Sequence, residues 1–530
     1  PQGQGRKARA GQEYGRETLP ITTSVELPAA HPFLDADIPW LLRRTAEAHP
    51  DRPFLIWEPF EGEPRTWTYA EARSWARRTA SGLAARGVKP RDPVILHLEN
   101  SPESVLTWLA CAELGAVAVT TNARSAGPEL AYFAKKSGAV GIITQPALAN
   151  LAREHLPDIG WIAVAEAGDE SLLGEKEIAA RPADPAHPFS VQFTSGTTAR
   201  PKGVLWTQAN GLWGAMVNAR HFGLRREDVS FVHGPLFHTV AQAWQVLGSL
   251  WVGAAVVVQP KFSASRFWDV AVRNGVTWCT GGGFSSQALA GQTTPDHKLR
   301  FIFGGISLAS VEPFGVRSIG AHGMTELITH AVYNDPYGPL DLDSIGRPAP
   351  DYAVRVVHED GSPVAPGELG ELQVKGVRGV SIFAEYLDDP EATAASFTDD
   401  GYFRTSDLLR LRADGAFQFA DRLKDMLKVG GENVAASEIE AVVRQAPGVQ
   451  EVAVVAAPHR MLAEAPIAFV IPAPDAPADL ADQILALCRA NLADFKVPRG
   501  VRLVDDFPRA LLNKVAKVEL RKLLQAEGAL

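Results

Sequence analysis

Cysteine is scarce in this chain, with three residues among 530. Cys111, Cys279 and Cys488 stand far apart, so neither a disulfide framework nor a zinc site is indicated. Cys111 lies in an apolar helical pattern and is interpreted as a small buried side chain. The cysteine content fits a reducing compartment, and we expect a cytoplasmic protein.

Long hydrophobic runs and an excess of positive charge are also missing. The formal net charge of -9 argues against a nucleic-acid partner and against a basic membrane-binding patch. The longest apolar run, Val246 to Val258, is shorter than the roughly 18 to 20 residues that span a bilayer. We interpret it as the end of a buried helix followed by a core strand. Residues 1–17 are polar, and we expect a disordered leader rather than a signal peptide.

The length and the pattern of elements predict an α/β protein with several domains. A chain of 530 residues is too long for one hydrophobic core. Strands and helices alternate up to about Ser344, which predicts two parallel-type sheets covered by helices. Short strands and Gly-Pro turns then predict an antiparallel β subdomain at about 345–420. We expect a large N-terminal domain at 18–420, a hinge at 421–424 and a small, mobile α+β lid domain at 425–530.

The most informative motif is TSGTTARPKG, over residues 194–203. It follows the apolar run FSVQF at 189–193, which is predicted to be a buried strand. A glycine lets backbone approach a ligand closely, and exposed N–H groups in such a loop bind anions. We therefore expect a phosphate cradle, with a solvated turn as the alternative. Its contacts would come from Thr194, Ser195, Gly196, Thr197, Thr198 and Lys202.

Six further motifs follow in the sequence. They are GGI (304–306), HGMTE (322–326), DSIGRP (343–348), GYFRTSD (401–407), DRLKDMLKVGGENV (421–434) and LNKVAK (512–517). In this order, from about Pro39 to Lys522, the motifs resemble those of the adenylate-forming superfamily of acyl-CoA synthetases, luciferases and peptide-synthetase adenylation domains. The resemblance implies that ATP activates a carboxylic acid as an acyl-adenylate, with release of pyrophosphate. Transfer of the acyl group to CoA and a requirement for Mg²⁺ are also implied.

The resemblance assigns the nucleotide contacts residue by residue. Thr325 would contact the α-phosphate, and Glu326 would hold Mg²⁺, which prefers oxygen ligands. Asp407 would bind the ribose hydroxyls. Taken alone, a Thr-Glu pair more often begins a helix, and an aspartate is more often a surface charge. The remaining contacts would come from Gly304, Gly305, Ile306, His322, Gly323, Met324 and Arg422, with His322 stacking near adenine.

The C-terminal motifs imply a lid that serves two half-reactions. Lys514 would reach the carboxylate and the α-phosphate, with Lys517 as the neighbouring alternative. Lys424 would be the hinge about which the lid rotates. The rotation would replace Lys514 by the segment 429–434, where Gly430 and Gly431 would let pantetheine pass, and Lys428 would meet a carboxylate or a phosphate.

The acid would lie near His238, which stands in the P-x-F-H pattern of the superfamily and titrates in a useful range. The alternative is a hydrogen-bonded core histidine. We expect the pocket to be lined by residues 240–244, 281–285, 304–306 and 327–331. They include Trp244, Gln242, Phe284, Ser285, Thr329 and His330. This mixture favours a small or medium polar acid, aromatic acids included, over a long fatty acid, and Phe237-His238-Thr239 disfavours an amino acid.

The motifs FTSGTTARPKG, FSASRFWDV and KGVRGVSIFAEYLDDPEAT resemble the crotonobetaine/carnitine-CoA ligase-like branch. Several positions depart from the superfamily pattern: Ala199, Ser406 and Asn513 replace glycines, and the segment around Val311 is short. A non-CoA acceptor (an amine, a carrier protein) or activation of an oxyanion such as nitrite therefore stays open. A non-catalytic nucleotide-binding protein is a more distant alternative. The sequence leaves the oligomeric state open, a homodimer included.

Overall fold

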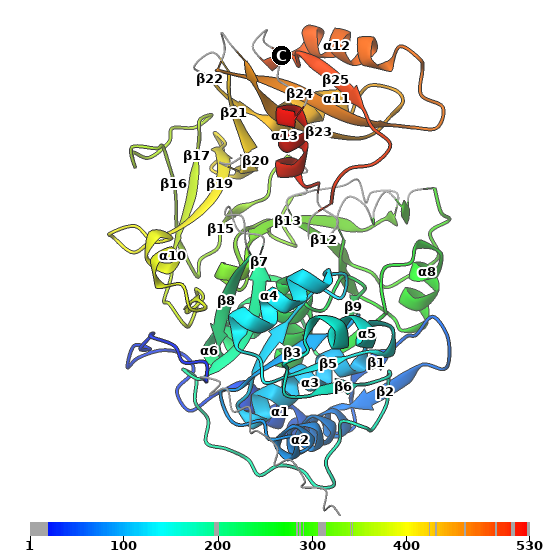
Figure 1. Cartoon of the computed structure of the whole chain (residues 1–530), viewed down its shortest axis with the longest axis vertical. Helices are drawn as coiled ribbons and strands as arrows, with labels where there is room; N and C mark the ends of the chain where they lie inside the picture. The colour runs from blue at the N-terminus through cyan, green and yellow to red at the C-terminus, as the bar shows by residue number, and fades with distance from the viewer. Residues whose placement is uncertain are drawn as a thin grey trace, which may run out of the picture.

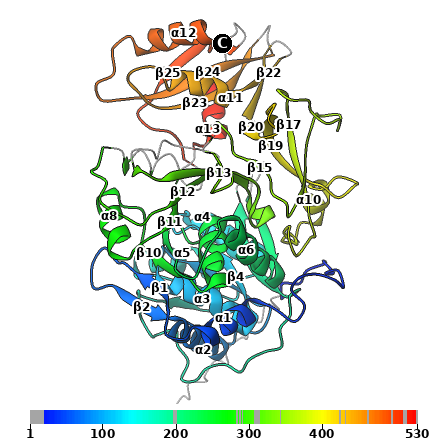
Figure 2. The ribbon, with the colours of Figure 1, turned by 180° about the vertical axis from the view of Figure 1, so that it is seen from behind.

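The computed structural model describes residues 20–194, 201–281, 285, 288–289, 291–305, 314–339, 341, 343–422, 425–429, 432–459, 463–492, 496–509 and 515–526. Two views from opposite sides show a large lower part and a small upper part, which the C-terminal elements form (Figures 1 and 2). Among the described helices, none is both long enough and apolar enough to cross a membrane.

A seven-stranded sheet carries the hairpin that leads into the phosphate-loop motif. Its strands, in spatial order, are β18 (Glu385–Tyr386), β8 (Lys202–Thr207), β7 (Pro188–Thr194), β4 (Val117–Thr120), β3 (Pro93–His97), β5 (Gly141–Thr144) and β6 (Ile162–Val164). Strands β7 to β6 are parallel, whereas β8 and β18 add an antiparallel edge. The predicted strand at 189–193 is confirmed within β7.

A nine-stranded sheet lies beside it. Its strands, in spatial order, are β15 (Arg347–Pro348), β14 (His330–Tyr333), β13 (Arg317–Gly323), β12 (Phe301–Gly305), β11 (Trp278–Thr280), β9 (Val229–Val232), β10 (Ala255–Val258), β1 (Pro53–Trp57) and β2 (Arg65–Thr68). The centre, from β1 to β13, is parallel as predicted. Both edges are antiparallel, because β1–β2 and β13–β14 are joined by short connections that reverse the chain.

Helices cover the two sheets, as the alternating pattern predicts (Figure 1). They are α1 (Ile38–Ala48), α2 (Tyr69–Ala85), α3 (Pro102–Leu114), α4 (Gly127–Ser137), α5 (Pro146–His155), α6 (Gln208–His221), the π-helix η1 (Val240–Leu247), α7 (Gly248–Val252) and α8 (Ala264–Arg273). The apolar run at 246–258 forms the end of η1, then α7 and the core strand β10, which confirms its interpretation. Cys111 is fully buried in α3.

An antiparallel sheet follows where short strands were predicted. Its order is β16 (Ala353–Val357), β17 (Leu369–Lys375), β19 (Phe403–Leu411) and β20 (Phe417–Arg422), and the short helix α10 (Pro390–Ala395) precedes β19. The C-terminal elements are β21 (Met426–Val429), β22 (Glu432–Ala435), α11 (Ala436–Val443), β23 (Val449–His459), β24 (Ala463–Pro472), α12 (Leu480–Asn491), β25 (Gly500–Leu503) and α13 (Lys517–Ala526). They enclose hydrophobic clusters of their own, such as that around Leu427, Ile439 and Val454.

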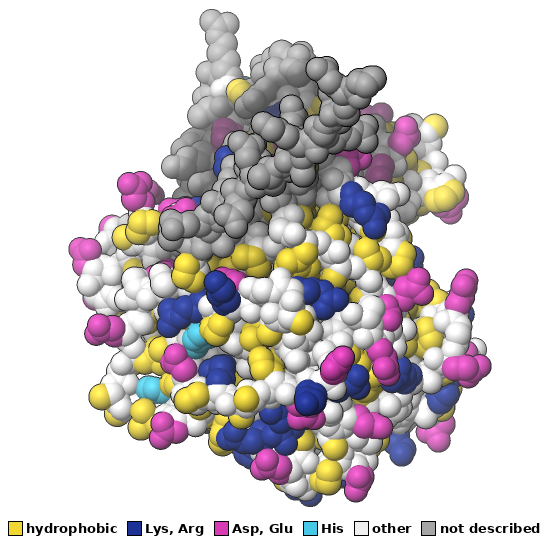
Figure 3. Space-filling model, turned by 60° about the horizontal axis from the view of Figure 1, so that its bottom comes forward, with side chains coloured by type: hydrophobic (Ala, Val, Ile, Leu, Met, Phe, Trp, Pro, Cys, Tyr) yellow, Lys and Arg dark blue, Asp and Glu magenta, His cyan; other side chains and the backbone are white. Residues whose placement is uncertain are grey.

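The surface at the bottom of the molecule, where α1 and α2 lie in Figure 1, mixes both signs of charge. Lysine and arginine side chains are interspersed with aspartate and glutamate on the described part of this face (Figure 3). Neither sign dominates it, in keeping with the modest negative net charge of the chain.

Candidate active site

Strands β7 and β8 bring the two ends of the phosphate-loop motif together. Thr194 and Lys202 are directly opposite each other in the antiparallel ladder. The Tyr132 hydroxyl donates a hydrogen bond to the Pro201 carbonyl over 2.9 Å and holds the start of β8. Ser195, Gly196, Thr197 and Thr198 lie outside the described residues. The β7–β8 hairpin therefore holds the two ends of the predicted phosphate loop in place.

One aromatic ring connects this hairpin to the HGMTE motif. The Lys202 ammonium lies 4.5 Å from the centre of the Tyr386 ring, in cation–π geometry. The Tyr386 hydroxyl donates to Glu326 Oε1 over 2.9 Å. Burial, and next the Glu326 charge, raise the pKa of Tyr386, so the phenol stays protonated and keeps its donor. Lys202 and Glu326 thus flank one buried phenol.

Buried hydrogen bonds hold Thr325, which begins the single 3₁₀ turn Thr325–Leu327 after β13. The Thr239 hydroxyl lies 3.0 Å from the Thr325 hydroxyl and donates to Gln192 Oε1 over 2.6 Å. The indole of Trp206 donates to the Thr325 carbonyl over 2.9 Å. The pair Thr325-Glu326 therefore begins a short helical turn and also occupies a polar network between β7, β8 and η1.

His322 and Asp407 form a buried pair at the nucleotide end. His322 Nε2 lies 2.7 Å from Asp407 Oδ2, and the imidazole stacks on Phe419 with an interplanar angle of 19°. A carboxylate oxygen accepts, so Nε2 is the donor in this contact. Nδ1 of His322 has no hydrogen-bond partner among the described residues. An aromatic hydrocarbon at this position would keep the stacking on Phe419 and lose the hydrogen bond to Asp407.

The backbone before Asp407 adopts a conformation that glycine favours. Ser406 has φ of 58°, and its N–H donates to Glu371 Oε1 over 3.1 Å. Such an angle is uncommon for a residue with a side chain. The substitution of serine for the glycine of the superfamily therefore leaves the turn in place. Asp407 is directly opposite Arg422 in the β19–β20 ladder, so the two predicted contacts share one end of the sheet.

A cavity of about 860 Å³ joins the nucleotide end to a second region around His238. Predicted residues that line it are His322, Gly323, Asp407, Gly304, His238, Val240, Ala241, Trp244, Gly281 and Ser285. The cavity is also bordered by Asn100, Asn122, Arg124, His233, Gln245, Lys261, Phe262, Thr280, Phe303 and Arg509, which the motifs do not single out. Phe284, Ile306 and Val311 lie outside the described residues.

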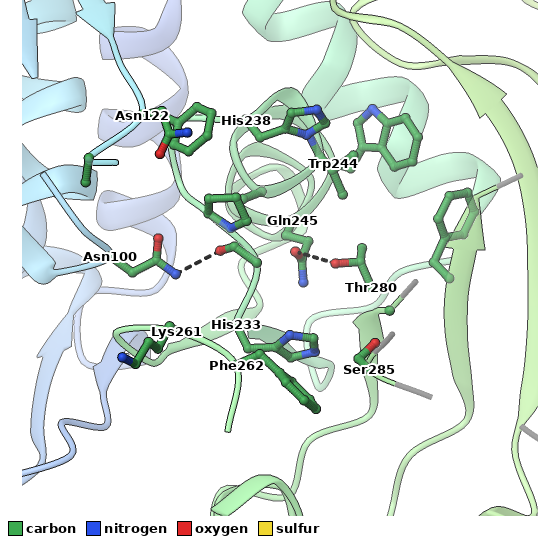
Figure 4. Close-up of a pocket in the computed structure, with 18 of the residues that line it drawn as sticks. Asn100, Asn122, His233, His238, Trp244, Gln245, Lys261, Phe262, Thr280 and Ser285 are labelled. Atoms are coloured by element: carbon green, nitrogen blue, oxygen red, sulfur yellow. Dashed lines mark hydrogen bonds between the residues drawn. The ribbon is translucent and has the colours of Figure 1, made fainter. Parts of the chain in front are cut away.

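Asn100 fixes the loop that presents His238. Its amide donates to the carbonyls of Gly234 and Gln259 over 2.8 and 3.0 Å, and its oxygen accepts from Leu236 N over 2.7 Å. His238 Nδ1 accepts from the N–H of Val240 over 3.3 Å, at the start of η1. Figure 4 shows His238 and Trp244 on one side of the cavity, with His233 and Phe262 on the other. These contacts join segments far apart in sequence, which is why motif reasoning missed Asn100.

The expectation that Gln242, Thr329 and His330 line the pocket is wrong. The amide oxygen of Gln242 accepts from Gln192 over 2.5 Å, which turns this side chain toward β7. The Thr329 hydroxyl donates to Asn218 Oδ1 over 2.6 Å. His330 Nε2 lies 2.8 Å from His221 Nδ1, behind the wall that Trp244 and Phe303 form.

Ile328, a β-branched residue with φ of 62°, accounts for the positions of Thr329 and His330. Its left-handed backbone reverses the chain between β13 and β14 and directs the next two side chains toward α6. Because such an angle is strained for a β-branched residue, it persists only where the surroundings enforce it. The Trp244 indole donates to the Ile328 carbonyl over 3.1 Å and supplies part of that restraint.

The C-terminal elements contribute Arg509 to the cavity wall. Arg509 makes two hydrogen bonds to the Glu451 carboxylate, over 2.9 and 2.8 Å, and forms a β-bridge with Val515. Lys514 lies outside the described residues but directly precedes Val515. The ammonium of Lys517 pairs instead with the buried Glu440 over 2.8 Å. Lys517, the alternative to Lys514, is therefore held by an ion pair within the C-terminal elements.

The predicted hinge region is described only in part. Lys424, Gly430 and Gly431 lie outside the described residues, as do the side chains of Arg422 and Lys428. Asp425 pairs with Arg521 of α13 over 2.9 Å, so the chain is already tied to the C-terminal elements one residue after Lys424. Across the junction, the Ser437 hydroxyl donates to the Ala420 carbonyl. The hinge position stays a prediction.

Comparisons with known proteins agree with the arrangement of motifs. A family model described as AMP-binding enzyme matches residues 42–387, and one described as AMP-binding enzyme C-terminal domain matches residues 438–514. The crotonobetaine/carnitine–CoA ligase of Salmonella paratyphi C (strain RKS4594) is 32% identical over 502 residues, which cover 90% of this chain and 97% of that protein.

Two solved structures show the same fold. The o-succinylbenzoate CoA synthetase of Bacillus subtilis, in complex with its acyl-adenylate intermediate, has a TM-score of 0.82 at 27% identity, over 91% of this chain and 97% of that one. MatB from Rhodopseudomonas palustris with ATP bound has a TM-score of 0.82 at 26% identity, over 92% and 99% of the two chains.

Proposed function

Because this chain belongs to the AMP-binding enzyme family, we propose that it is an ATP-dependent, AMP-forming acid–CoA ligase. A carboxylate oxygen of the acid attacks the α-phosphorus of ATP, and pyrophosphate leaves. The sulfur of CoA, having lost its proton, then attacks the carbonyl carbon, and the bond from that carbon to the AMP oxygen breaks. The products are an acyl-CoA thioester, AMP and pyrophosphate.

The observation that carries this proposal is the continuity of the cavity. One space of about 860 Å³ runs from the His322–Asp407 pair to His238 and Trp244. A nucleotide held at the first end and an acid held at the second would therefore meet without crossing solvent. Positioning of this kind, together with electrostatic stabilisation, supplies most of the acceleration in phosphoryl-type transfers.

Each residue then has a defined task. Asp407 accepts hydrogen bonds from the ribose hydroxyls, while His322 and Phe419 form an aromatic surface for the base. The Thr325 hydroxyl, fixed by Thr239, contacts the α-phosphate. Lys202 holds the outer phosphates beside the hairpin base. Lys514 places a cation at the carboxylate and the α-phosphate, where a compact ammonium stabilises the charge that develops.

Glu326 fits a magnesium ligand. The residue is 5% exposed, and its carboxylate lies across the Tyr386 ring from Lys202, which places an oxygen donor next to the proposed phosphate site. Mg²⁺ is commonly held by one or two carboxylates together with substrate phosphates. The described residues contain no group of three or more His, Cys, Asp or Glu that would bind a metal without phosphate. The ion would neutralise charge on the phosphates.

The acid is small or medium in size. The second region of the cavity is bordered by the aromatic side chains of Trp244, Phe303 and Phe262. Glu99, Glu129 and Asp407 are the carboxylates among its described lining residues. Glu99 accepts from Gln145, Glu129 accepts from the N–H of Ala126, and Asp407 pairs with His322, so each of the three already has a partner within the protein. A neutral acyl group therefore suits this region better than a cationic one.

The first half-reaction is the direct test. The protein is incubated with ATP, Mg²⁺ and a panel of carboxylic acids, and pyrophosphate release is followed with and without CoA. We expect release that depends on one class of acid and continues over many turnovers only when CoA is present. An acid-dependent release that turns over with an amine or a carrier protein, but not with CoA, would replace the acceptor in this proposal.

A further inference from the structure

His233 is a second histidine of the cavity and belongs to none of the motifs. It follows β9, is 7% exposed and lines the cavity. Its ring contacts three phenylalanines, Phe231, Phe262 and Phe267, at centroid distances of 5.2, 5.2 and 5.7 Å. This apolar setting lowers the pKa of His233 to about 4, because burial disfavours the charged form. The imidazole is therefore neutral near pH 7.

Nε2 of His233 is buried and has no hydrogen-bond partner among the described residues. Buried polar atoms in folded proteins are nearly always hydrogen-bonded, so each exception calls for a physical reason. Neighbouring polar groups do not meet this need. Gln245 donates to Ser230 Oγ and to the Phe231 carbonyl over 3.1 and 2.8 Å, and accepts from Thr280 over 3.1 Å.

The His233 ring borders the cavity. Figure 4 shows the His233 ring above Phe262, with Gln245 and Thr280 on the other side of the space and Ser285 across from it. His238 and Trp244 border the same space farther up (Figure 4). A ligand whose carboxylate lies toward His238 would direct its far end toward His233.

We propose that His233 determines specificity for the acid, by pairing through Nε2 with a hydroxyl group on the acyl chain. The proposal rests on the proposed adenylation function and names the class of acid: a compact hydroxylated carboxylic acid. A neutral imidazole nitrogen is a donor in one tautomer and an acceptor in the other. A hydroxyl both donates and accepts, so it matches either tautomer.

The first test compares acids that differ by one hydroxyl. The pairs are benzoate with 3- and 4-hydroxybenzoate, and butanoate with 3- and 4-hydroxybutanoate. For each member, kcat/KM of acid-dependent pyrophosphate release is measured in the wild type, in His233→Leu and in His233→Gln. We expect the wild type to prefer one hydroxylated member by about tenfold or more, since a site with a buried polar group discriminates against the analogue that cannot pair.

His233→Leu should reduce that preference to near one, and His233→Gln should keep part of it. His97→Gln is the matched control, because His97 is likewise a buried, neutral histidine but is not among the residues that line the cavity. A preference that is unchanged in His233→Leu, or one lost equally in His97→Gln, overturns the proposal. So does a His233→Leu variant in which only the KM for CoA changes.

A second test needs no substrate. If Nε2 is kept unpaired for a ligand, His233→Leu removes an unsatisfied buried atom, and thermal unfolding of the ligand-free protein should shift upward, by about one to a few degrees. His97 Nε2 is likewise without a hydrogen-bond partner among the described residues, but its Nδ1 lies 2.9 Å from the Thr121 hydroxyl, so His97→Leu also breaks a hydrogen bond and should not shift it upward. A downward shift in His233→Leu would mean that His233 is a structural residue.

The two tests separate the possible failures. If no acid of any class releases pyrophosphate, the adenylation function fails, and the unfolding comparison still decides whether His233 is kept unpaired. If apolar acids release pyrophosphate and the hydroxylated members have no advantage, the function holds and the assignment to His233 fails.

Discussion

The hydroxyl of Tyr386 donates a hydrogen bond to Glu326 over 2.9 Å, and the Lys202 ammonium lies over the same ring. Tyr386 belongs to β18, which pairs with β8, the strand that begins at Lys202. The sheet therefore sets the separation between the last cation of the phosphate-loop motif and the carboxylate proposed to hold Mg²⁺. Tyr386 is not among the described lining residues of the cavity, so we expect it to act by positioning both groups.

Tyr386→Phe keeps the ring face for Lys202 and removes the hydroxyl. We expect the Mg²⁺ concentration for half-maximal activity to rise by about tenfold or more, since a hydrogen bond to a charged group contributes about 1.5 to 3 kcal/mol. The KM for the acid should stay unchanged. Titration of Mg²⁺ at fixed ATP measures the first effect, and Mn²⁺ binding followed by electron paramagnetic resonance measures it without turnover.

Tyr69→Phe is the matched control for this variant. The Tyr69 hydroxyl also makes a buried hydrogen bond, to the Ala254 carbonyl over 2.7 Å, but lies outside the cavity lining. Its loss should lower stability and leave the Mg²⁺ dependence unchanged. Equal Mg²⁺ dependence in Tyr386→Phe and the wild type would show that Glu326 needs no positioning by the phenol.

Lys514 and Lys517 offer a second comparison within one motif. Lys514→Ala should slow acid-dependent pyrophosphate release by about 100-fold or more, because the loss of one charge-stabilising donor costs that much in comparable sites. Thioester formation from a supplied acyl-adenylate should continue. Lys517→Ala should do the opposite: it leaves the buried Glu440 without its ammonium, so it lowers the stability of the C-terminal elements while adenylation proceeds. If Lys517→Ala is the variant that stops adenylation in a folded protein, the assignment of Lys514 is wrong.

Asp407 should bind the ribose hydroxyls of ATP. In the wild type, 2′-deoxy-ATP and 3′-deoxy-ATP should have higher KM values than ATP, because each lacks a hydroxyl that the carboxylate accepts from. Asp407→Asn should raise the KM for ATP and reduce this discrimination. His322→Phe is the companion variant: it removes the 2.7 Å contact to Asp407 and keeps a flat ring against Phe419. Undiminished discrimination in Asp407→Asn would place the ribose elsewhere.

The buried histidines predict a loss of stability in acid. Burial lowers the pKa of His97 and of His233 to about 4, whereas an unfolded histidine has a pKa of about 6.5. Each contribution to stability is complete above pH 6.5 and is lost as the pH falls toward 4, because the unfolded chain then binds the extra proton. His233→Leu should therefore lose less stability than the wild type between pH 7 and 4.5, by up to about 2 to 3 kcal/mol.

Chemical unfolding at both pH values measures this difference. Glu103 and Glu113, whose pKa values burial raises to about 7, contribute the opposite slope. They are the same in both proteins, so their effect cancels when the two curves are subtracted. Parallel pH dependence in the wild type and His233→Leu would indicate that His233 is hydrated rather than buried.

The sequence predicts those parts of the site that depend on local order along the chain. The strand before Thr194 follows from a continuous apolar run, and the antiparallel strands around Asp407 follow from their turn residues. The displacement of Thr329 and His330 does not, because it depends on one residue, Ile328, held at a positive φ by contacts from a distant helix. Periodicity carries no information about such a reversal.

The role of His233 also cannot be predicted from the sequence. A histidine after an apolar strand is equally compatible with a hydrogen-bonded core residue. In the structure, Phe231, Phe262 and Phe267 surround the His233 ring, and its Nε2 has no hydrogen-bond partner among the described residues. Asn100 is a similar case, since its three hydrogen bonds reach segments more than a hundred residues away.

The path of one oxygen atom tests the central claim most directly. The acid is labelled with ¹⁸O in its carboxylate and incubated with the protein, ATP, Mg²⁺ and CoA, and the products are analysed by mass spectrometry. We predict one ¹⁸O in each AMP, unlabelled pyrophosphate and an acyl-CoA thioester, because the carboxylate oxygen bonds to the α-phosphorus and stays there when the thioester forms. Formation of ADP, or label in inorganic phosphate with none in AMP, would contradict an acyl-adenylate.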